Sequence, residues 1–346
     1  MTTLTQEAVI ERPAHVVRPA APLATIDRLF KGAAYGCALF VLVVLLGILG
    51  SMVYGGWPVF REFGFFGFLT SSIWDVNNDN YGAWPAVAGT LTTAFIALVI
   101  GVPISLGIAI YLTQLAPPWL KQPIGTAIEL LAAVPSIIYG MWGLFVLAPL
   151  VARYVQVPLN SVVEGMPIVG TILYSQVPSG TGIATAGVIL ALMIIPFIAS
   201  ITRDMLDQIP TVLRESAYGI GCTTWEVVRY VLIPQAGVSI IGAVMLGLGR
   251  ALGETMAVTF VVGNANRLSA SIFEPGSTIA SRIANEFNEA LGMQLHALIA
   301  LGCILFLVTF GVLVVARYLV SRVSLRHVSA PARARRGIGP RRGHRR

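Results

Sequence analysis

Long apolar runs alternate with short polar segments over most of the chain. A helix that spans a bilayer needs about 20 consecutive, mainly apolar residues, and six runs are long enough. We place them at 33–54, 86–112, 127–152, 183–202, 237–263 and 295–319. The pattern predicts an all-α integral membrane protein with six transmembrane helices.

The composition supports a membrane protein. Of 346 residues, 56% are hydrophobic and 11% are charged, and the mean hydropathy is +0.79. Soluble domains carry about 25% charged residues, so a soluble fold is excluded. We divide the chain into an N-terminal arm at 1–31, a membrane domain at 32–325 and a basic tail at 326–346.

The basic residues predict the topology. Of the 23 Lys and Arg residues, 18 lie on the side that holds both termini, four lie in the opposite loops, and Arg250 lies within an apolar run. Lys and Arg are enriched in cytoplasmic loops, so both termini are predicted to be cytoplasmic. Topology therefore explains the net charge of +7 without a nucleic-acid partner. The Arg-rich tail is either solvated or in contact with anionic membrane lipid.

Arg250 and Glu254 are the clearest candidates for chemistry. Arg250 lies thirteen residues from each end of the run at 237–263, which is about 20 Å from either end at 1.5 Å per residue. A charge at such depth costs about 3 kcal/mol or more and is typical of an ion path or an interior pair. The i, i+4 spacing predicts a salt bridge to Glu254, and a purely structural pair is the alternative. Gly249 and Gly253 would let another helix approach closely.

A second candidate lies in the run at 127–152, where Pro135 is followed by Ser136 and Tyr139. Proline removes one helical hydrogen bond, and broken membrane helices with nearby polar groups often line a route. Ser136 and Tyr139 are therefore path candidates, and a simple packing kink is the alternative. The segment at 153–182 is predicted to be an external loop, because its apolar pieces are too short to cross.

A polar segment at 210–234 separates the fourth and fifth apolar runs. Glu215, Glu226 and Arg229 place charge along it, so we expect it to lie in water as a helical segment facing a soluble partner. An ordinary cytoplasmic connector helix is the alternative.

Four stretches carry a family resemblance. The spacing of five residues in the polar segment resembles the EAA coupling loop of bacterial ABC-importer permeases: Glu215, Ala217, Gly221, Ile233 and Pro234. Ser216 stands where that motif has alanine. Three further stretches resemble the PstC family of phosphate ABC-importer permeases: YGAWPAVAGTL at 81–91, ELLAAVPSIIYGMWGLF at 129–145 and GRALGETMAVTFVVGN at 249–264. The likeness covers residues 39–323.

The resemblance implies a type I ABC importer permease fold in a bacterial inner membrane. It implies an ATP-driven phosphate importer, and the path candidates taken from the residues are Arg250, Glu254, Ser136 and Tyr139. It places the five residues of the coupling motif against an ATPase. The implied partners are a homologous second permease (PstA-like), two copies of a cytoplasmic ATPase (PstB-like) and a phosphate-binding protein outside.

Several chemistries are excluded by the residues. No G-x4-G-K-[ST] phosphate loop occurs, so the chain is not expected to be an enzyme and ATP hydrolysis is expected in another subunit. Four scattered His residues and three Cys residues show no ligand spacing, so no metal, cofactor or disulfide is expected. Other open readings are a permease for sulfate, molybdate or phosphonate, a passive anion channel, and a phosphate-signalling scaffold.

Overall fold

The computed structural model describes residues 21–166, 169–267 and 269–328. Residues 1–20 of the predicted arm and 329–346 of the predicted tail lie outside this part of the chain. The described residues are mostly helical, with one two-stranded antiparallel hairpin. The chain divides into two units, Met1–Ser51 and Met52–Arg346.

Helical elements follow one another along most of the described chain. The first part contains α1 (Ala21–Phe63), α2 (Phe65–Thr70), β1 (Trp74–Asp75), β2 (Asn80–Tyr81), α3 (Trp84–Ile110), η1 (Tyr111–Leu115), α4 (Pro118–Ala132), α5 (Ser136–Trp142), η2 (Gly143–Leu147), α6 (Ala148–Val151), η3 (Ala152–Gln156) and α7 (Val157–Val163). The second part contains α8 (Val169–Leu173), α9 (Ile183–Asp207), α10 (Thr211–Gly219), α11 (Thr224–Val227), η4 (Val228–Leu232), α12 (Ile233–Gly253), α13 (Met256–Val261), α14 (Ile279–Glu286) and α15 (Met293–Val328). The η elements are π-helical turns.

Six helical segments of the described chain are long and apolar enough to cross a membrane, which confirms the prediction. They are Ile26–Phe63, Trp84–Leu115, Ser136–Val163, Ile183–Asp207, Thr224–Gly253 and Met293–Tyr318. The first and last helices extend beyond the predicted boundaries of the membrane domain at 32–325. α1 already begins at Ala21, within the predicted arm, and α15 continues to Val328, within the predicted tail.

The first unit contains, of the described residues, only the N-terminal part of α1. Large apolar side chains point outward along it, and Phe40 and Leu46 are 68% and 57% exposed. A helix that is apolar all round is typical of a membrane span.

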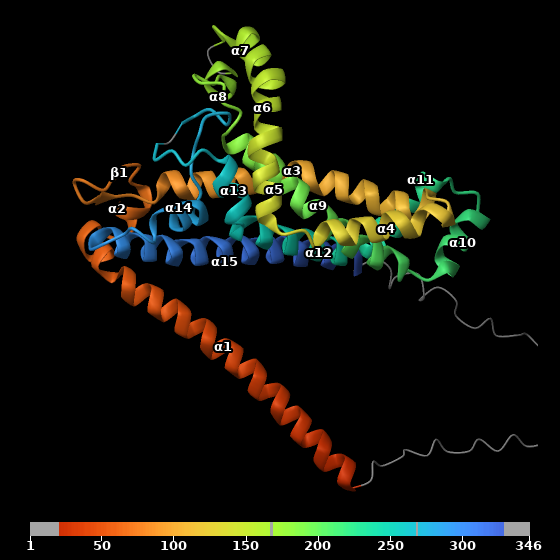
Figure 1. Ribbon diagram of the computed structural model, residues 1–346. Helices are drawn as coiled ribbons and strands as arrows, with labels where there is room; N and C mark the ends of the chain where they lie inside the picture. The colour runs from red at the N-terminus through yellow and green to blue at the C-terminus, as the bar shows by residue number, and fades with distance from the viewer. Residues whose placement is uncertain (1–20, 167–168, 268, 329–346) are drawn as a thin grey trace, which may run out of the picture. The chain divides into compact units, whose positions relative to one another are not determined.

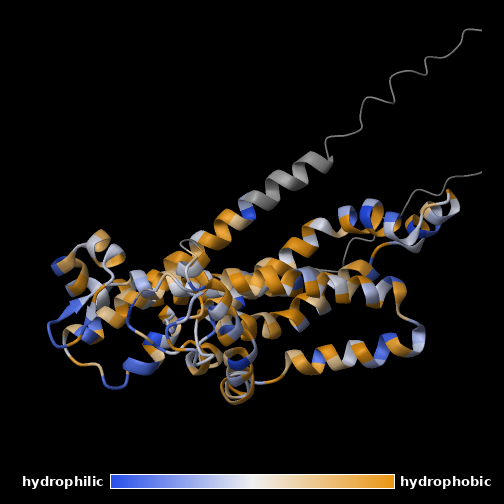
Figure 2. Ribbon diagram, turned by 90° about the horizontal axis from the view of Figure 1, so that it is seen from above, coloured by the Kyte–Doolittle hydropathy of each residue, from blue (hydrophilic) through white to orange (hydrophobic). Residues whose placement is uncertain are grey.

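The core of the second unit is a bundle of α3, α9, α12 and α15 (Figure 1). Glycines let the helices approach closely, since Gly101, Gly187 and Gly247 each face an isoleucine of the neighbouring helix. The Ser105 hydroxyl of α3 donates to the Ile195 carbonyl of α9 at 3.1 Å. Apolar residues follow the lengths of these helices, and polar residues gather at their ends and in the loops (Figure 2).

The third membrane helix differs from the prediction. α4 ends at Ala132, and a new helical run begins at Ser136 and continues through α5, α6 and α7 to Val163, across the direction of α3 and α9 (Figure 1). Pro135 has no amide hydrogen, and the residue before a proline is pushed out of the helical conformation, so the chain breaks here rather than bending. Arg153, predicted to begin an external loop, therefore lies within the helical run.

The fifth membrane helix is also interrupted. α12 ends at Gly253, Glu254 is extended with ψ 124°, and the short α13 follows. The prediction of one uninterrupted helix over 237–263 is wrong. Glycine has a low helix propensity, and the Glu254 carboxylate accepts the Ala257 amide at 3.3 Å. A carboxylate that caps a helix start favours a break over continued helix.

A small folded cap lies at the end of the bundle opposite α10 (Figure 1). β1 pairs with β2 in antiparallel register, and the buried Arg282 of α14 stacks on Trp74 at 4.6 Å. Trp74 Nε1 also donates to Glu286 at 2.9 Å. Burial lowers the pKa of Arg282 to about 10, and the nearby Glu286 carboxylate partly offsets this. These contacts fasten the hairpin to α14.

The crossing of α3 and the start of α14 gives a test of the packing. A methyl group at Gly89 would overlap the backbone carbonyl of Ser277. Gly89→Ala should therefore lower the free energy of unfolding by about 1–3 kcal/mol or more, measured as thermal unfolding in detergent. Gly107→Ala is the control, because no heavy atom lies within 4 Å of that site. Equal melting temperatures for both variants would contradict this packing.

Candidate functional site

The two interrupted membrane helices meet. α5, which starts after the Pro135 break, packs against α13, which starts after the Glu254 break. The approach is close, since a Cβ on Gly140 would lie 2.9 Å from the Ala257 Cα. A helix end leaves backbone groups without intrahelical partners. Lipid cannot satisfy them, so such breaks occur where protein or a polar path surrounds them.

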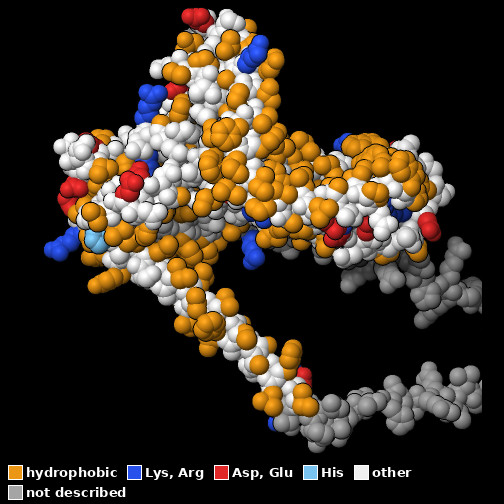
Figure 3. Space-filling view, viewed as in Figure 1, with side chains coloured by type: hydrophobic (Ala, Val, Ile, Leu, Met, Phe, Trp, Pro, Cys, Tyr) orange, Lys and Arg blue, Asp and Glu red, His pale blue; other side chains and the backbone are white. Residues whose placement is uncertain are grey.

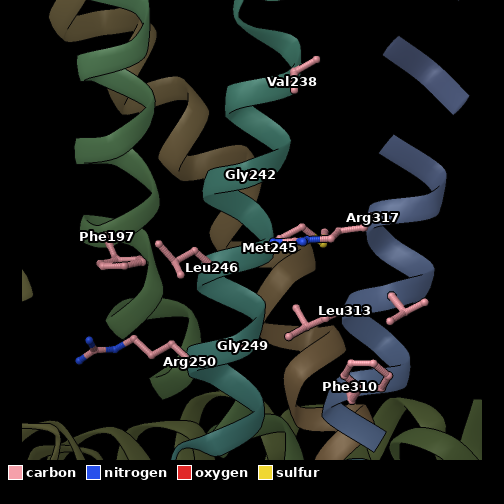
Figure 4. A pocket seen from close by; sticks show the side chains of 11 residues that line it. Phe197, Val238, Gly242, Met245, Leu246, Gly249, Arg250, Phe310, Leu313 and Arg317 are labelled. Atoms are coloured by element: carbon pink, nitrogen blue, oxygen red, sulfur yellow. The ribbon is translucent and has the colours of Figure 1, made fainter. Parts of the chain in front are cut away.

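Arg250 lies in the last turn of α12, directly before the second break. Its side chain is exposed, and its guanidinium lies 5.9 Å from the ring centroid of Phe197 on α9 (Figure 4). The described residues form no ion pair with it, so the predicted Arg250–Glu254 salt bridge is wrong. Two residues four apart share a face only while the helix continues, and α12 ends between these two. Arg250 retains a charge with unused donors.

Glu254 binds a backbone amide instead of forming the predicted ion pair with Arg250. It is half-buried, and its carboxylate accepts the backbone amide of Ala257 in the first turn of α13. Negative charge is favourable at a helix N-terminus. Glu254 therefore fixes the start of α13.

Ser136 and Tyr139 lie at the first break, as the sequence predicts. The Tyr139 hydroxyl donates to the Leu131 carbonyl at 2.9 Å and so bridges from α5 back to the last turn of α4. Ser136 is the half-buried first residue of α5, a helix start whose amides favour an anion.

A groove of about 1050 Å³ runs along α12, between α9 and α15, and reaches Arg250 (Figure 4). Its lining is apolar apart from two arginines: Phe197, Val238, Gly242, Met245, Leu246, Gly249, Arg250, Phe310, Leu313, Val314 and Arg317. No heavy atom lies within 4 Å of a Cβ built at Gly242, Gly249 or Gly253. The close helix approach predicted at Gly249 and Gly253 is therefore not made by the described part of this chain.

The polar segment at 210–234 is not one helix. α10 ends at Gly219, a turn follows, and α11 continues through η4 into α12. Gly221 has a φ of +93°, and its amide donates to the Tyr218 carbonyl at 2.9 Å while the Cys222 amide donates to Ala217 at 3.1 Å. This pair of bonds is the Schellman motif, which favours glycine at that position. Gly221 thus serves the turn itself.

The predicted coupling residues occupy different places around this turn. Glu215 is exposed on α10, whereas Ala217 is only 7% exposed and packs beneath it. Ile233 and Pro234 are exposed at the start of α12. All five predicted residues thus lie along the α10–α12 segment, but only some of them can touch a partner.

Two of the exposed apolar residues of this segment flank its turn and were missed from the sequence. Ile220 is 82% exposed and Trp225 is 62% exposed, on either side of the Gly221 turn. Large apolar side chains inside a polar segment are a signal that sequence reasoning can read. We call Ile220 and Trp225 the apolar turn pair.

Comparison with known proteins supports the same fold. Residues 101–325 match the family described as "Binding-protein-dependent transport system inner membrane component". The structure is similar to a chain of the bacterial alginate ABC transporter in complex with alginate pentasaccharide-bound periplasmic protein. The TM-score is 0.57 at 17% identity, covering 86% of this chain and 97% of that chain. The likeness confirms the ABC importer permease fold.

Two curated relatives are much more similar in sequence. The phosphate transport system permease protein PstC of Pasteurella multocida is 52% identical over 298 residues, which cover 86% of this chain and 92% of that protein. PstC of Mesorhizobium japonicum is 51% identical over 304 residues, covering 88% of this chain and 92% of that protein. The similarity therefore extends over nearly the whole length of both relatives.

The turn after α10 provides a test of local structure. Gly221→Ala should weaken the turn by about 1–2 kcal/mol, because an L-residue is disfavoured at positive φ. Amide hydrogen exchange at Cys222 should then become about tenfold faster. Gly219→Ala is the matched control, since it ends α10 with no heavy atom within 4 Å and no positive φ. Unchanged exchange in Gly221→Ala would show that this turn does not depend on glycine.

Proposed function

Because the chain belongs to the PstC family of phosphate transport system permease proteins, we propose that Arg250 contacts phosphate on its path through an ATP-driven importer. The chain is the permease subunit, and ATP is hydrolysed elsewhere. The observation that carries the proposal is the position of Arg250 in the last turn of α12, directly before the second helix break and without an ion-pair partner in the described chain.

The chemistry of Arg250 suits phosphate. A guanidinium offers a planar fork of donors that matches two oxygens of a phosphate. The start of α5 adds backbone amides that favour an anion. Glu254 lies on the other side of the α12 break and can compete with phosphate for Arg250 when α12 and α13 rearrange. Such competition would allow release as well as binding.

The α10–α11 turn is the proposed docking site for the PstB-like ATPase. The apolar turn pair is exposed beside the charged Glu215, and exposed apolar residues rimmed by polar ones are typical of protein interfaces. α11 leads without interruption through η4 into α12. Movement of the turn can therefore reach Arg250 along one continuous helical run.

The groove along α12 is the proposed contact with the PstA-like second permease. Its lining is mainly apolar, and Gly242 and Gly249 leave space for a closely packed helix. The second subunit would cover this groove and close the path around Arg250. A helix from a homologous permease fits both the shape and the chemistry of this surface.

The distribution of Lys and Arg supports an orientation with both termini in the cytoplasm of a bacterial inner membrane. The α10 end then faces the ATPase, and the hairpin end faces outward. The similar alginate transporter was solved with a periplasmic protein. A phosphate-binding protein is the corresponding partner proposed for the hairpin end.

Substitution of Arg250 tests the phosphate contact. Arg250→Lys keeps the charge but loses the donor fork, so it should lose most phosphate uptake, and Arg250→Gln should lose nearly all. Complex assembly should persist, because the mainly apolar lining proposed to contact the second permease is unchanged. Uptake and complex yield are measured in proteoliposomes, with Glu254→Gln and the double variant Arg250→Gln, Glu254→Gln alongside. Full uptake by the double variant would overturn the phosphate contact.

The same vesicles separate the other readings. Phosphate flux through the unaltered complex without ATP would favour a passive channel, and equal uptake of sulfate would favour a broader oxyanion permease. A scaffold that only signals would assemble without supporting uptake. The proposal expects ATP-dependent uptake that sulfate does not match.

Substitution of the apolar turn pair tests docking. Ile220→Ser and Trp225→Ala should each weaken binding of the ATPase by about 1–3 kcal/mol, because exposed aromatic and aliphatic anchors dominate such interfaces. Binding is measured by titrating the purified ATPase against the permease pair in nanodiscs. Leu291→Ser is the control, since Leu291 is 83% exposed at the opposite end of the bundle. Unchanged affinity in both variants would place the ATPase elsewhere.

A further inference from the structure

The end of α9 is fastened to α10. The Arg214 side chain of α10 donates to the Leu206 carbonyl in the last turn of α9. Below this contact, Leu206, Ala217 and Val227 share one apolar cluster and are at most 7% exposed. Displacement of α10 would therefore carry the end of α9 with it.

The same end of α9 is fastened to α4 by charge. Arg203 Nη2 lies 2.7 Å from Glu129 Oε1, and Lys121 Nζ lies 3.1 Å from Asp207 Oδ1. Within the described residues, these two ion pairs are the ones that join separate helices. Charged side chains gather over α4, whereas the faces of the helices nearer the middle of the bundle are apolar (Figure 3).

Gly125 leaves room for the Arg203 side chain to reach Glu129. A Cβ at Gly125 would collide with Arg203 Nη1, so the guanidinium crosses α4 over a position without a side chain. The Arg203 side chain is only 16% exposed, although its partner Glu129 is 56% exposed. The arginine is thus held against α4 by its surroundings as well as by the carboxylate.

The C-terminal end of α4 lies at the first helix break, the one at Pro135. This helix ends at Ala132, and the Tyr139 hydroxyl holds the Leu131 carbonyl from the far side of Pro135. α5 then rests against α13 at Gly140. A displacement of α4 would therefore reach the region of the site through direct contacts.

We propose that the Arg203–Glu129 pair is a strut that transmits movement of α10 through α4 to the helix break at Pro135. Arg203 is a positioning residue in this scheme and touches no substrate. The α11–η4–α12 run moves one side of the site, and the strut moves the other, so both helix breaks respond to the same docking event. The inference rests on the proposed docking of an ATPase at α10.

Because the Glu129 side chain is 56% exposed, water solvates its charge when Arg203 is replaced and the pair contributes little to stability, so variants of the strut should assemble. Arg203→Gln and Glu129→Gln are tested in the complete importer in proteoliposomes. Each should lower the phosphate taken up per ATP hydrolysed about fivefold, and the double variant should be no worse than either single one. Lys31→Gln is the control, because it breaks an exposed pair with Asp27 within one helix. A normal ratio in Arg203→Gln would overturn the strut.

A second variant removes the contact without removing a charge. Gly125→Ala should favour the helix of α4, yet its methyl group displaces the Arg203 guanidinium. It should therefore lower the uptake-to-ATP ratio as Arg203→Gln does, while Gly107→Ala leaves the ratio unchanged. If Arg203→Gln fails to assemble, Gly125→Ala decides alone. A normal ratio in Gly125→Ala would then contradict the proposal.

The failure of the strut and the failure of the proposed function look different. If the proposed function is wrong, the unaltered complex itself shows no coupling between ATP hydrolysis and phosphate uptake. If only the strut is wrong, the unaltered complex couples normally, the apolar turn pair affects ATPase binding, and the Arg203 and Gly125 variants keep the unaltered ratio.

Discussion

A membrane interior offers no water to backbone amides and carbonyls. The interrupted helices of this protein therefore depend on other hydrogen-bond partners for the backbone groups at each break. At the first break, the Tyr139 hydroxyl donates a hydrogen bond to the Leu131 carbonyl. At the second break, the Glu254 carboxylate accepts a hydrogen bond from the Ala257 amide. Each break is thus held by its own side chain, and α5 packs on α13 beside them. Arg250 lies in the last turn of α12, directly before the second break, with an exposed side chain in an otherwise apolar groove.

α9 connects this site with the α10 end of the bundle. It is the most buried of the six membrane helices, and it packs against α3 and α12 through closely fitted glycines. Its last turns contact α10 by Arg214 and α4 by Arg203. A rigid central helix with attachments at one end suits the proposed transmission of movement from the α10 end of the bundle to the Arg250 site.

Hydropathy predicted six membrane helices because length and apolar content decide that property. It did not locate the breaks: one span was placed over 127–152 across Pro135, and Gly253 lies in a run that reads as continuous. The Arg250–Glu254 pair failed for the same reason, since i, i+4 proximity assumes an intact helix. Arg203 and Glu129 are 74 residues apart, and only the tertiary packing of α4 on α9 brings them together. The family resemblance was readable because its motifs lie in contiguous stretches.

The central claim is that the guanidinium of Arg250 contacts phosphate inside the assembled importer. The most direct measurement is an electron cryomicroscopy structure of the complete complex, trapped during transport with phosphate in the membrane path. The account predicts phosphate oxygens about 2.8 Å from two guanidinium nitrogens of Arg250, as in a bidentate pair. Phosphate bound elsewhere along the path, with Arg250 in contact with protein or lipid only in every trapped state, would contradict it.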